Sequence, residues 1–427
     1  MSLSTPESPE FPTIPTGREV LADHDVRTFL VSQVLIYTAV ALQLAIEGKQ
    51  IFDITGHASD LAWLGLAEFL PAPFLVFITG SVVDIIDRKK VAAFALAGEL
   101  ACVAALALYS ANHPPMHKTP VWPFFLIAFA FGAFRSFTSP ALRAIPPMIA
   151  PDNALPRVIA LFSATFTGAG IVGAAISGAL YVIAPWVAYA TAAAFLGVGL
   201  ILMLPVRFKR QPRPRDPDQK TTLKSALEGL RFIKATPVLL SIISLDLFAV
   251  LFGGAVALLP AIATDRLHVG DVAYGWLRAA PGIGAAMMAI FLASHPLRRH
   301  VGRTLLIVVA LFGVGTVVLG FTRNFAIAFV ALLVLTGADM VSVFVRSSLV
   351  PLLTPDEKRG RVLAVEDVFI GASNQLGAFE SGMAAQGLGL VPAIAGGGVA
   401  TIGVVAIFWF TFPGLRKIDR FEDLTQE

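Results

Sequence analysis

Long apolar stretches alternate with short polar segments along almost the whole chain. Each stretch is about 20 residues long, the length that an α-helix needs to cross a hydrocarbon core about 30 Å thick. The pattern predicts twelve membrane spans, at residues 26–47, 60–83, 91–111, 122–144, 157–182, 185–206, 238–262, 273–293, 304–321, 325–347, 361–384 and 391–413. The sequence therefore predicts an all-α integral membrane protein.

Polar segments divide the predicted spans into two groups of six. Residues 1–25 form a predicted cytoplasmic tail, which lacks the basic start and apolar centre of a cleavable signal peptide. It is followed by an N-terminal half, a cytoplasmic connector, a C-terminal half and a second cytoplasmic tail: 26–206, 207–237, 238–413 and 414–427. Within the connector, apolar residues at helical spacing from Leu223 to Ile233 predict a helix that lies along the membrane surface.

The composition excludes a soluble protein. Hydrophobic residues make up 56% of the 427 residues and charged residues only 14%, with a mean hydropathy of +0.76, whereas soluble domains contain about half apolar residues. The 36 Gly and 28 Pro suit a membrane bundle, where small residues permit close helix approach and neighbours repair the backbone groups that proline frees. The single cysteine, Cys102, excludes an intrachain disulfide and a thiolate metal cluster, so we expect no metal.

Basic residues predict the orientation of the chain. If both termini lie in the cytoplasm, most Lys and Arg of the loops and helix ends fall on that side. The opposite side then has only four: Lys49, Lys118, Arg266 and Arg323. Because cytoplasmic loops carry an excess of Lys and Arg, both termini are predicted to be cytoplasmic. The basic excess is then membrane-surface charge, and no nucleic-acid partner is expected.

An internal repeat relates the two predicted halves. The segment Pro147 to Leu161 (PMIAPDNALPRVIAL) aligns with Pro351 to Val365 (PLLTPDEKRGRVLAV). The register continues over four glycines, which we interpret as helix-packing positions: Gly173, Gly178, Gly377 and Gly382. Parallel duplication predicts a substrate cavity between the halves near the bilayer midplane, although chance similarity between glycine-rich helices is an alternative.

A short charged segment, GSVVDIIDRKK, joins the second and third predicted spans. Its glycine lets the second helix approach a neighbour closely, and its first aspartate can point at the N-terminus of another helix, where unpaired N–H groups favour an anion. We predict a conformational latch formed by four of its residues: Gly80, Asp84, Arg88 and Lys89. The alternative is that the basic residues only anchor the loop at the membrane surface.

These features together resemble the Major Facilitator Superfamily over essentially the whole chain. In that family the loop motif runs Gly, three residues, Asp, a basic residue, any residue, Gly and two basic residues. Here Ile85 stands in place of the first basic residue and Asp87 in place of the second glycine. The Asp-Arg-basic ending is more similar to the branch that includes the enterobactin exporter and macrolide-efflux-like proteins. The resemblance implies alternating access, with the eleventh helix as the neighbour of Asp84.

Ionisable residues inside the predicted spans are candidates for proton coupling. Each costs at least ~2.5 kcal/mol in hydrocarbon and is usually kept for function. No histidine lies well inside a span, so the coupling groups are expected to be carboxylates. We assign proton coupling or cavity contact to five residues: Asp246, Asp339, Arg135, Glu99 and Arg278. A carboxylate near an arginine is not easily protonated, whereas one released from it into an apolar cavity is.

Other interpretations stay open for some of these charges. Asp246 and Arg278 could instead form a fixed pair within the second half. Glu366 and Asp367 lie near the start of the eleventh predicted helix, where acids favour the helix dipole, so we interpret them as caps. Two further acids lie nearer the outer ends of their spans and are expected to face water: Glu68 and Glu380.

The sequence contains no phosphate-binding GxxxxGK, no HExxH and no nucleophile elbow. We therefore expect no enzyme activity and no cofactor, with a proton gradient as the energy source. The prediction is a monomeric secondary transporter in a bacterial inner membrane that exports an amphipathic small molecule such as a drug or siderophore. A carrier of a lipid, lysophospholipid or metabolite is the alternative. In a different class, the protein could be a non-transporting membrane sensor or scaffold.

Overall fold

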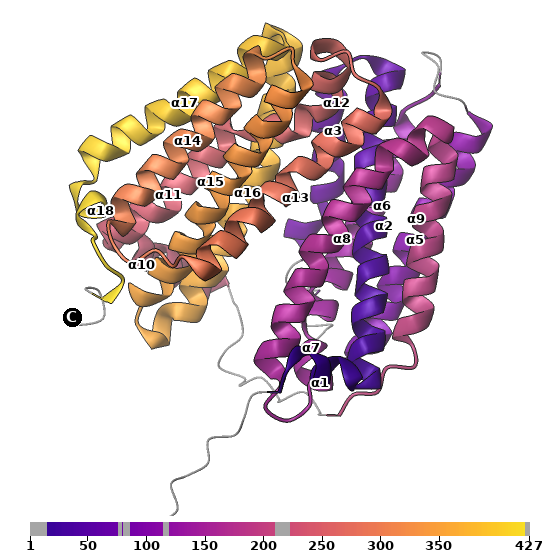
Figure 1. The fold of residues 1–427 in the computed structure, drawn as a ribbon, viewed down its shortest axis with the longest axis horizontal. Coiled ribbons are helices and arrows are strands. Elements are labelled where there is room, and N and C mark those ends of the chain that lie inside the picture. Colours follow the sequence, from indigo (N-terminus) through magenta and orange to yellow (C-terminus); the bar gives the residue numbers. More distant parts are fainter. Residues whose placement is uncertain (1–14, 76–78, 80–85, 114–118, 210–222, 423–427) are drawn as a thin grey trace, which may run out of the picture.

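The computed structural model describes residues 15–75, 79, 86–113, 119–209 and 223–422. In these ranges the chain consists of helices and their connections, with no β-strand. Figure 1 shows two helix bundles, with the N-terminal half drawn in indigo to magenta and the C-terminal half in orange to yellow. The predicted all-α architecture in two helical halves is therefore confirmed.

The described helices of the N-terminal half are α1 (Gly17–Ala22), α2 (His24–Thr55), α3 (Ala58–Phe69), α5 (Arg88–Asn112), α6 (Trp122–Arg143), α7 (Pro146–Ile149), α8 (Leu155–Ile183) and α9 (Pro185–Met203). Helix α2 begins where the Asp23 carboxylate accepts the backbone N–H groups of Asp25 and Val26. It ends at Gly56, whose φ of 65° is a left-handed conformation that glycine adopts without steric cost.

Asp23 also ties the start of α2 to the segment that follows α9. Its carboxylate accepts a hydrogen bond from the Lys209 ammonium, and the backbone N–H of Arg207 donates to Asp25 Oδ1 at 3.0 Å. Burial alone raises the pKa of Asp23, but the bonds from Lys209 and from the backbone lower the pKa below its ordinary value. The carboxylate therefore stays ionised and holds the two ends of the N-terminal half together.

The C-terminal half contains α10 (Leu223–Ala235), α11 (Pro237–Phe252), η2 (Gly254–Leu258), α12 (Leu259–Ala261), η3 (Ile262–Arg266), α13 (Asp271–Ser294), α14 (Val301–Phe321), α15 (Phe325–Leu352), α16 (Asp356–Leu388), α17 (Leu390–Thr411) and α18 (Pro413–Lys417). The predicted connector helix is present as α10. Its Glu228 forms an ion pair with Arg361 of α16, so the helix is fastened to the C-terminal half.

The seventh predicted span is not one continuous helix: α11 is followed by the short elements η2, α12 and η3. The change occurs at Gly253 and Gly254, where α16 lies very close. A Cβ on Gly254 would come within 2.2 Å of the Gly377 carbonyl oxygen, which real Cβ atoms do not tolerate. Close approach of the two helices therefore requires glycine on both sides.

Ten helical segments in the described part of the chain are long and apolar enough to cross a membrane. The second and eleventh predicted spans fall outside that set for different reasons. Helix α3 has only 12 described residues, and α16 is long but carries many charges. The ten segments are consistent with a twelve-span fold.

Several span boundaries differ from the prediction, and at two of them the difference comes from charged residues. Helix α2 continues to Thr55 rather than residue 47, because Lys49 and Asp53 neutralise each other one turn apart and are tolerated inside the helix. Helix α16 begins at Asp356 rather than residue 361, with the acidic pair Asp356 and Glu357 in its first turn. Charges that hydropathy reads as loop residues are thus part of both helices.

The halves meet at one end and diverge at the other. We call the end that carries α1, α7, α10 and α18 the terminal end, and the end near Gly56 the opposite end. In Figure 1 the two bundles separate toward the terminal end. At the opposite end Phe52, Ala58 and Leu61 of the N-terminal half join an apolar cluster formed mainly by the C-terminal half. The interface between the halves is therefore closed at the opposite end.

Small residues make this interface close. A Cβ on Gly178 of α8 would come within 1.8 Å of the Asp271 carbonyl oxygen of α13. On the other side of the interface, a Cβ on Gly382 of α16 would come within 2.7 Å of Ala62 Cβ on α3. The other two glycines of the repeat do not lie at this interface. Gly173 packs against α2 and Gly377 packs against α11, each inside its own half.

Candidate functional site

The C-terminal half contains a buried ion pair. Arg346 Nη1 on α15 donates to Asp246 Oδ2 on α11 at 2.7 Å, and each residue is only 5% exposed. Asp339, two turns earlier on α15, lines a small cavity together with Asp246. Glu366 of α16 also interacts electrostatically with Arg346 and is 7% exposed. The Arg346 guanidinium therefore interacts with three carboxylates, those of Asp246, Asp339 and Glu366. We call these four residues the C-terminal cluster.

Two earlier interpretations of these residues are wrong. Asp246 is paired with Arg346 and not with Arg278, because Arg278 interacts with Glu68 of the N-terminal half instead. Glu366 is not a cap, because α16 begins ten residues before it, roughly 15 Å away along the helix axis. Its neighbour Asp367 is exposed. The sequence could not identify Arg346 as the partner, since it lies 100 positions away from Asp246.

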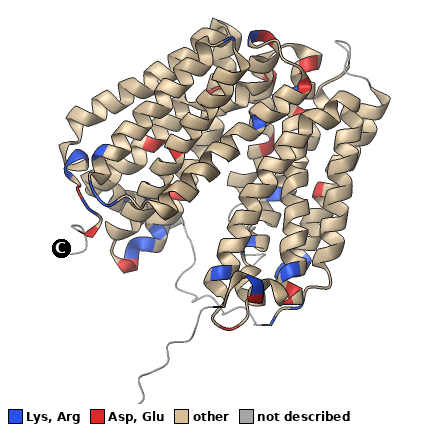
Figure 2. Cartoon of the chain, in the orientation of Figure 1, with Lys and Arg blue, Asp and Glu red and all other residues tan. Residues whose placement is uncertain are grey.

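A second set of charges lies in the N-terminal half. Glu99 of α5 is fully buried, with Arg135 Nη1 of α6 at 4.0 Å from Glu99 Oε2. Glu68 of α3 interacts with Arg135 and with Arg278 of α13 in the other half. Figure 2 shows acidic and basic positions along the helices of both bundles as well as at their ends. We call Glu68, Glu99, Arg135 and Arg278 the N-terminal cluster; it links the two halves through Arg278.

Glu68 was expected to face water near an outer end; the structure places it deeper along its span, with a side chain that is partly exposed. It lies ten residues beyond the start of α3 and therefore about 15 Å along the helix. A Cβ on Gly132 of α6 would come within 1.8 Å of the Glu68 carbonyl oxygen. The glycine lets α3 and α6 touch, which brings Glu68 into reach of Arg135 one turn away. Glu380, the other acid expected to face water, is exposed, and its carboxylate accepts a hydrogen bond from the Ser381 hydroxyl at 3.4 Å.

A third group of charges joins the halves at the opposite end and was missed by sequence reasoning. Lys49 Nζ lies 2.7 Å from Asp53 Oδ2 on its own helix and 3.2 Å from Asp271 Oδ1 at the start of α13. The hydroxyl of Tyr181 on α8 donates to Asp53 Oδ2 at 2.8 Å. The hydroxyl of Tyr274 on α13 donates to the Ala45 carbonyl at 2.7 Å. The four-residue spacing of Lys49 and Asp53 was the available signal.

The predicted latch is only partly visible. Gly80 and Asp84 lie outside the described residues, so their roles stay predictions. Lys89 Nζ donates to the Val206 carbonyl at 3.0 Å, and Arg88 Nη1 lies 3.7 Å from Met148 Sδ. Arg88 and Lys89 thus fasten the start of α5 to neighbouring segments of their own half.

Asp87, which departs from the family motif, caps α5. Its Oδ1 accepts the backbone N–H of Lys89 at 2.8 Å. We expect Asp87→Ala to destabilise the protein by about 0.5–2 kcal/mol, because this N–H loses its acceptor. The buried Cys102 of α5 allows a direct measurement, since a thiol-reactive dye labels it when the helix opens on heating. Asp87→Asn, which keeps a capping oxygen, should melt close to the unsubstituted protein; an equal loss in both variants would contradict the cap.

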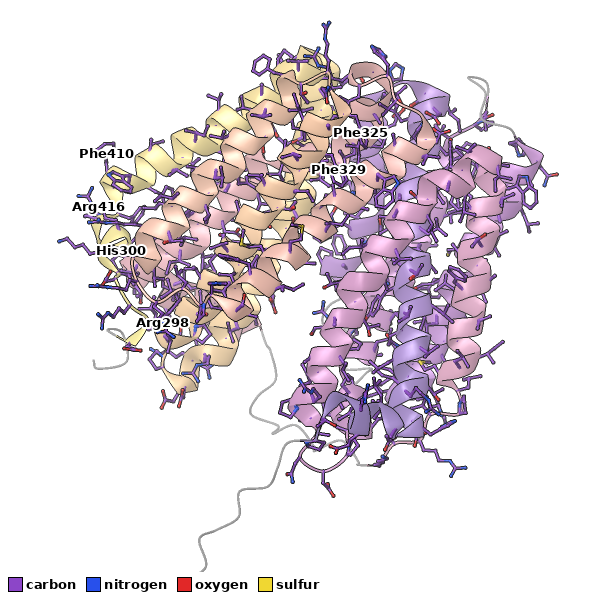
Figure 3. All side chains as sticks on the ribbon, in the orientation of Figure 1. Arg298, His300, Phe325, Phe329, Phe410 and Arg416 are labelled. Atoms are coloured by element: carbon purple, nitrogen blue, oxygen red, sulfur yellow. The ribbon has the colours of Figure 1, made fainter. Side chains whose placement is uncertain are left out.

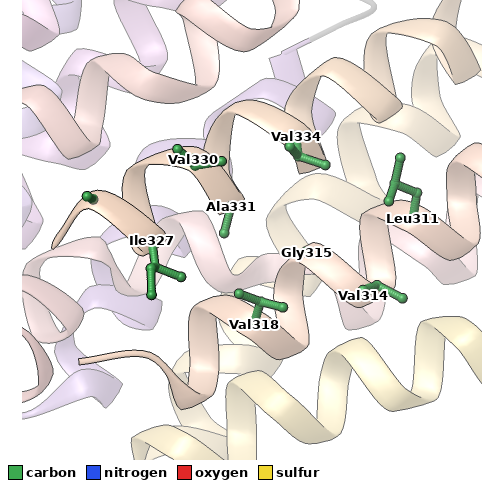
Figure 4. A pocket seen from close by; sticks show the side chains of 9 residues that line it. Leu311, Val314, Gly315, Val318, Ile327, Val330, Ala331 and Val334 are labelled. Atoms are coloured by element: carbon green, nitrogen blue, oxygen red, sulfur yellow. The ribbon is translucent and has the colours of Figure 1, made fainter. Parts of the chain in front are cut away.

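An apolar groove of about 400 Å³ lies between α14 and α15 (Figure 4). Its lining includes Val314, Val318, Ile327 and Val330, all exposed side chains without polar atoms. Such a surface suits contact with lipid acyl chains. It offers no group that orients a substrate, so the charged clusters are the better candidate site.

Buried charged clusters inside two helical halves that touch at only one end are typical of a membrane transporter rather than an enzyme. The chain belongs to the Major Facilitator Superfamily, whose profile matches residues 29–365. The family named by the sequence resemblance is therefore confirmed.

Relatives at low identity include efflux proteins. The chain is 27% identical over 397 residues to the multidrug efflux pump Tap of Mycolicibacterium fortuitum, covering 86% of this chain and 91% of that protein. It is 25% identical over 242 residues to macrolide efflux protein A of Streptococcus pyogenes, covering 55% of this chain and 57% of that protein. An uncharacterised transporter of Bacillus subtilis, YfiS, is 27% identical over 289 residues, covering 66% of this chain and 64% of YfiS.

Solved transporters share the fold. The nucleoside transporter NupG matches with a TM-score of 0.70 at 12% identity, covering 92% of this chain and 100% of that chain. A bacterial homologue of the human lysosomal transporter Spinster matches with a TM-score of 0.66 at 16% identity, covering 92% of this chain and 96% of that chain. At these identities the likeness shows the fold alone.

Proposed function

We propose that the protein is a proton-coupled exporter of amphipathic small molecules. The observation that carries the coupling is the C-terminal cluster, in which one buried guanidinium is the shared counter-charge of three carboxylates. If movement of the halves separates Asp339 or Glu366 from Arg346, the released carboxylate stands in an apolar surrounding and takes up a proton. The match to Tap over most of both chains supports export of drug-like molecules.

The terminal end is the cytoplasmic end in this proposal, and the membrane is the inner membrane of a bacterium. Basic residues gather at that end, as Figure 3 shows for Arg298, His300 and Arg416 near α18. An excess of Lys and Arg marks cytoplasmic loops. The arrangement described above would then be open to the cytoplasm and closed toward the outside, ready to accept a substrate between the halves.

No cofactor is needed for this cycle, because the proton gradient supplies the energy. A single chain holds both halves and both charged clusters, so the transporter is expected to work as a monomer. The substrate would bind near the bilayer midplane, between the Arg278-bearing α13 and the helices of the N-terminal cluster.

Proteoliposomes test the proposal. With a macrolide as the probe and an imposed pH gradient, we expect macrolide transport together with counter-movement of protons. Asp339→Asn should abolish gradient-driven transport but retain macrolide counterflow, which needs no net proton movement. The matched control is Glu357→Gln, an exposed acid in the first turn of α16 that should leave both activities unchanged. Unaltered gradient-driven transport in Asp339→Asn would remove this residue from the coupling role.

A further inference from the structure

Helix α2 carries an unusual set of polar side chains through the centre of the N-terminal half. Four are at most 1% exposed: Gln33, Gln43, Glu47 and Gln50. Several of their polar atoms have no hydrogen-bond partner in the described part of the chain, among them Glu47 Oε1, Gln43 Oε1 and Gln50 Nε2. The buried hydroxyl of Tyr189 on α9 is also unpaired there. Buried polar groups are almost always paired, so this concentration requires a physical explanation.

Glu47 is the only acidic side chain among these four residues. Its Oε2 accepts a hydrogen bond from the Gln43 side-chain amide one turn earlier. Its carboxyl group interacts electrostatically with Glu68 of α3, Cys102 of α5 and Tyr189 of α9, none of which is a cation. A carboxylate buried without a cation is costly, and such a group is neutral instead.

Other elements packed against α2 do not supply the missing charge. Helix α13 contacts α2 through Tyr274, but its Arg278 interacts with Glu68 and Tyr274 and is not among the groups that act on the Glu47 carboxyl. Lys49 is only two residues away but points to a different side of the helix, about 200° around it, where it binds Asp53 and Asp271. Tyr181 of α8 is bound to that same Asp53. Helices α7 and α12 contain no titratable residue, and the charged residues of α1 lie at the far end of α2.

We propose that Glu47 is a proton-binding site inside the N-terminal half, occupied by a proton in the conformation described here. A neutral carboxyl group provides an O–H donor among the unpaired acceptors of this region, namely the amide oxygen of Gln43 and the hydroxyl of Tyr189. The site differs from the N-terminal cluster, where Arg135 faces Glu99. Its use in transport rests on the proton coupling proposed above, whereas its occupancy by a proton does not.

Infrared spectroscopy of the full-length protein in lipid tests the occupancy without any substrate. At neutral pH we expect a carbonyl band of a protonated carboxyl group that shifts in D₂O and is lost in Glu47→Gln. The control Glu357→Gln removes an exposed acid and should leave the band unchanged. Should Glu47→Gln fail to fold, Gln43→Leu removes the amide that donates to Glu47 and is expected to shift the same band.

Two results would overturn the proposal. One is a spectrum in which neither variant changes a protonated-carboxyl band, since Glu47 is then ionised. The other is a melting temperature that rises with Na⁺ in the unsubstituted protein but not in Glu47→Gln, which indicates a bound cation instead. Macrolide transport separates the two proposals. If the unsubstituted protein shows no proton-driven transport of the macrolide, the proposed function is overturned. The infrared band alone decides whether Glu47 holds a proton.

Discussion

Replacing Arg346 by glutamine is expected to be among the most damaging single changes in the chain, with a loss of about 3–5 kcal/mol of stability. Arg346 is 5% exposed and is the cation that Asp246, Asp339 and Glu366 share. Its removal leaves three carboxylates together without the cation that they share. Uncompensated buried charge costs more than the lost bond itself.

Asp246→Asn should be milder, although it breaks the same 2.7 Å contact. Arg346 then keeps Asp339 and Glu366 as counter-charges, so no charge is left without an opposite neighbour. The asymmetry distinguishes a shared cation from a simple pair, in which either substitution is equally harmful. Aliquots heated to graded temperatures and passed over a size-exclusion column give the apparent melting temperature of each variant.

The double variant Asp246→Asn with Arg346→Gln provides a further control. It removes one negative charge along with the arginine, so it should be more stable than Arg346→Gln alone. A double variant that loses the sum of the two single effects would show that the pair is not energetically coupled. If Asp246→Asn lowers the melting temperature as much as Arg346→Gln does, Asp339 and Glu366 do not depend on Arg346 as their counter-charge.

The sequence predicted the fold well because lipid imposes a simple rule on helix length and composition. It failed where a charge belongs inside a helix. Lys49 was assigned to an outer loop and Glu47 to the last position of its span, because hydropathy treats charge as a boundary. In the structure the neutralising partners of Lys49 are Asp53, one turn away, and Asp271, more than 200 residues away. Only the contact with Asp271 could not be predicted from the residues next to Lys49 in the sequence.

The candidate site shows the same division between local and distant information. Burial of Asp246 and Asp339 followed from their position within apolar stretches, but their common partner Arg346 depends on how three helices pack. The prediction placed Glu68 too near the outer end because the close contact of its helix with α6 occurs at a residue without a side chain, Gly132. A glycine within a helix indicates that another element packs closely there, but the sequence does not identify that element.

Substituting Lys49 by glutamine is expected to open the interface between the halves at the opposite end. Lys49 is 5% exposed and lies between Asp53 of α2 and Asp271 of α13, so its removal leaves two carboxylates facing each other across the interface. Truncating one partner of a buried charge pair costs about 2–5 kcal/mol. Since about 1.4 kcal/mol changes an equilibrium tenfold, the population closed at this end should fall by more than one order of magnitude.

Distances between spin labels measure this change, and the chain suits the method because its single cysteine is buried. In a Cys102→Ser background, cysteines at His57 and Leu388 report on the opposite end, and cysteines at Arg157 and Glu357 report on the terminal end; all four positions are exposed. Lys49→Gln should lengthen the first distance and shorten the second. Lys49→Arg keeps the cation and should retain the original distribution. If Lys49→Gln leaves both distances unchanged, the apolar contacts of Phe52, Ala58 and Leu61 hold this end closed without the ion pair.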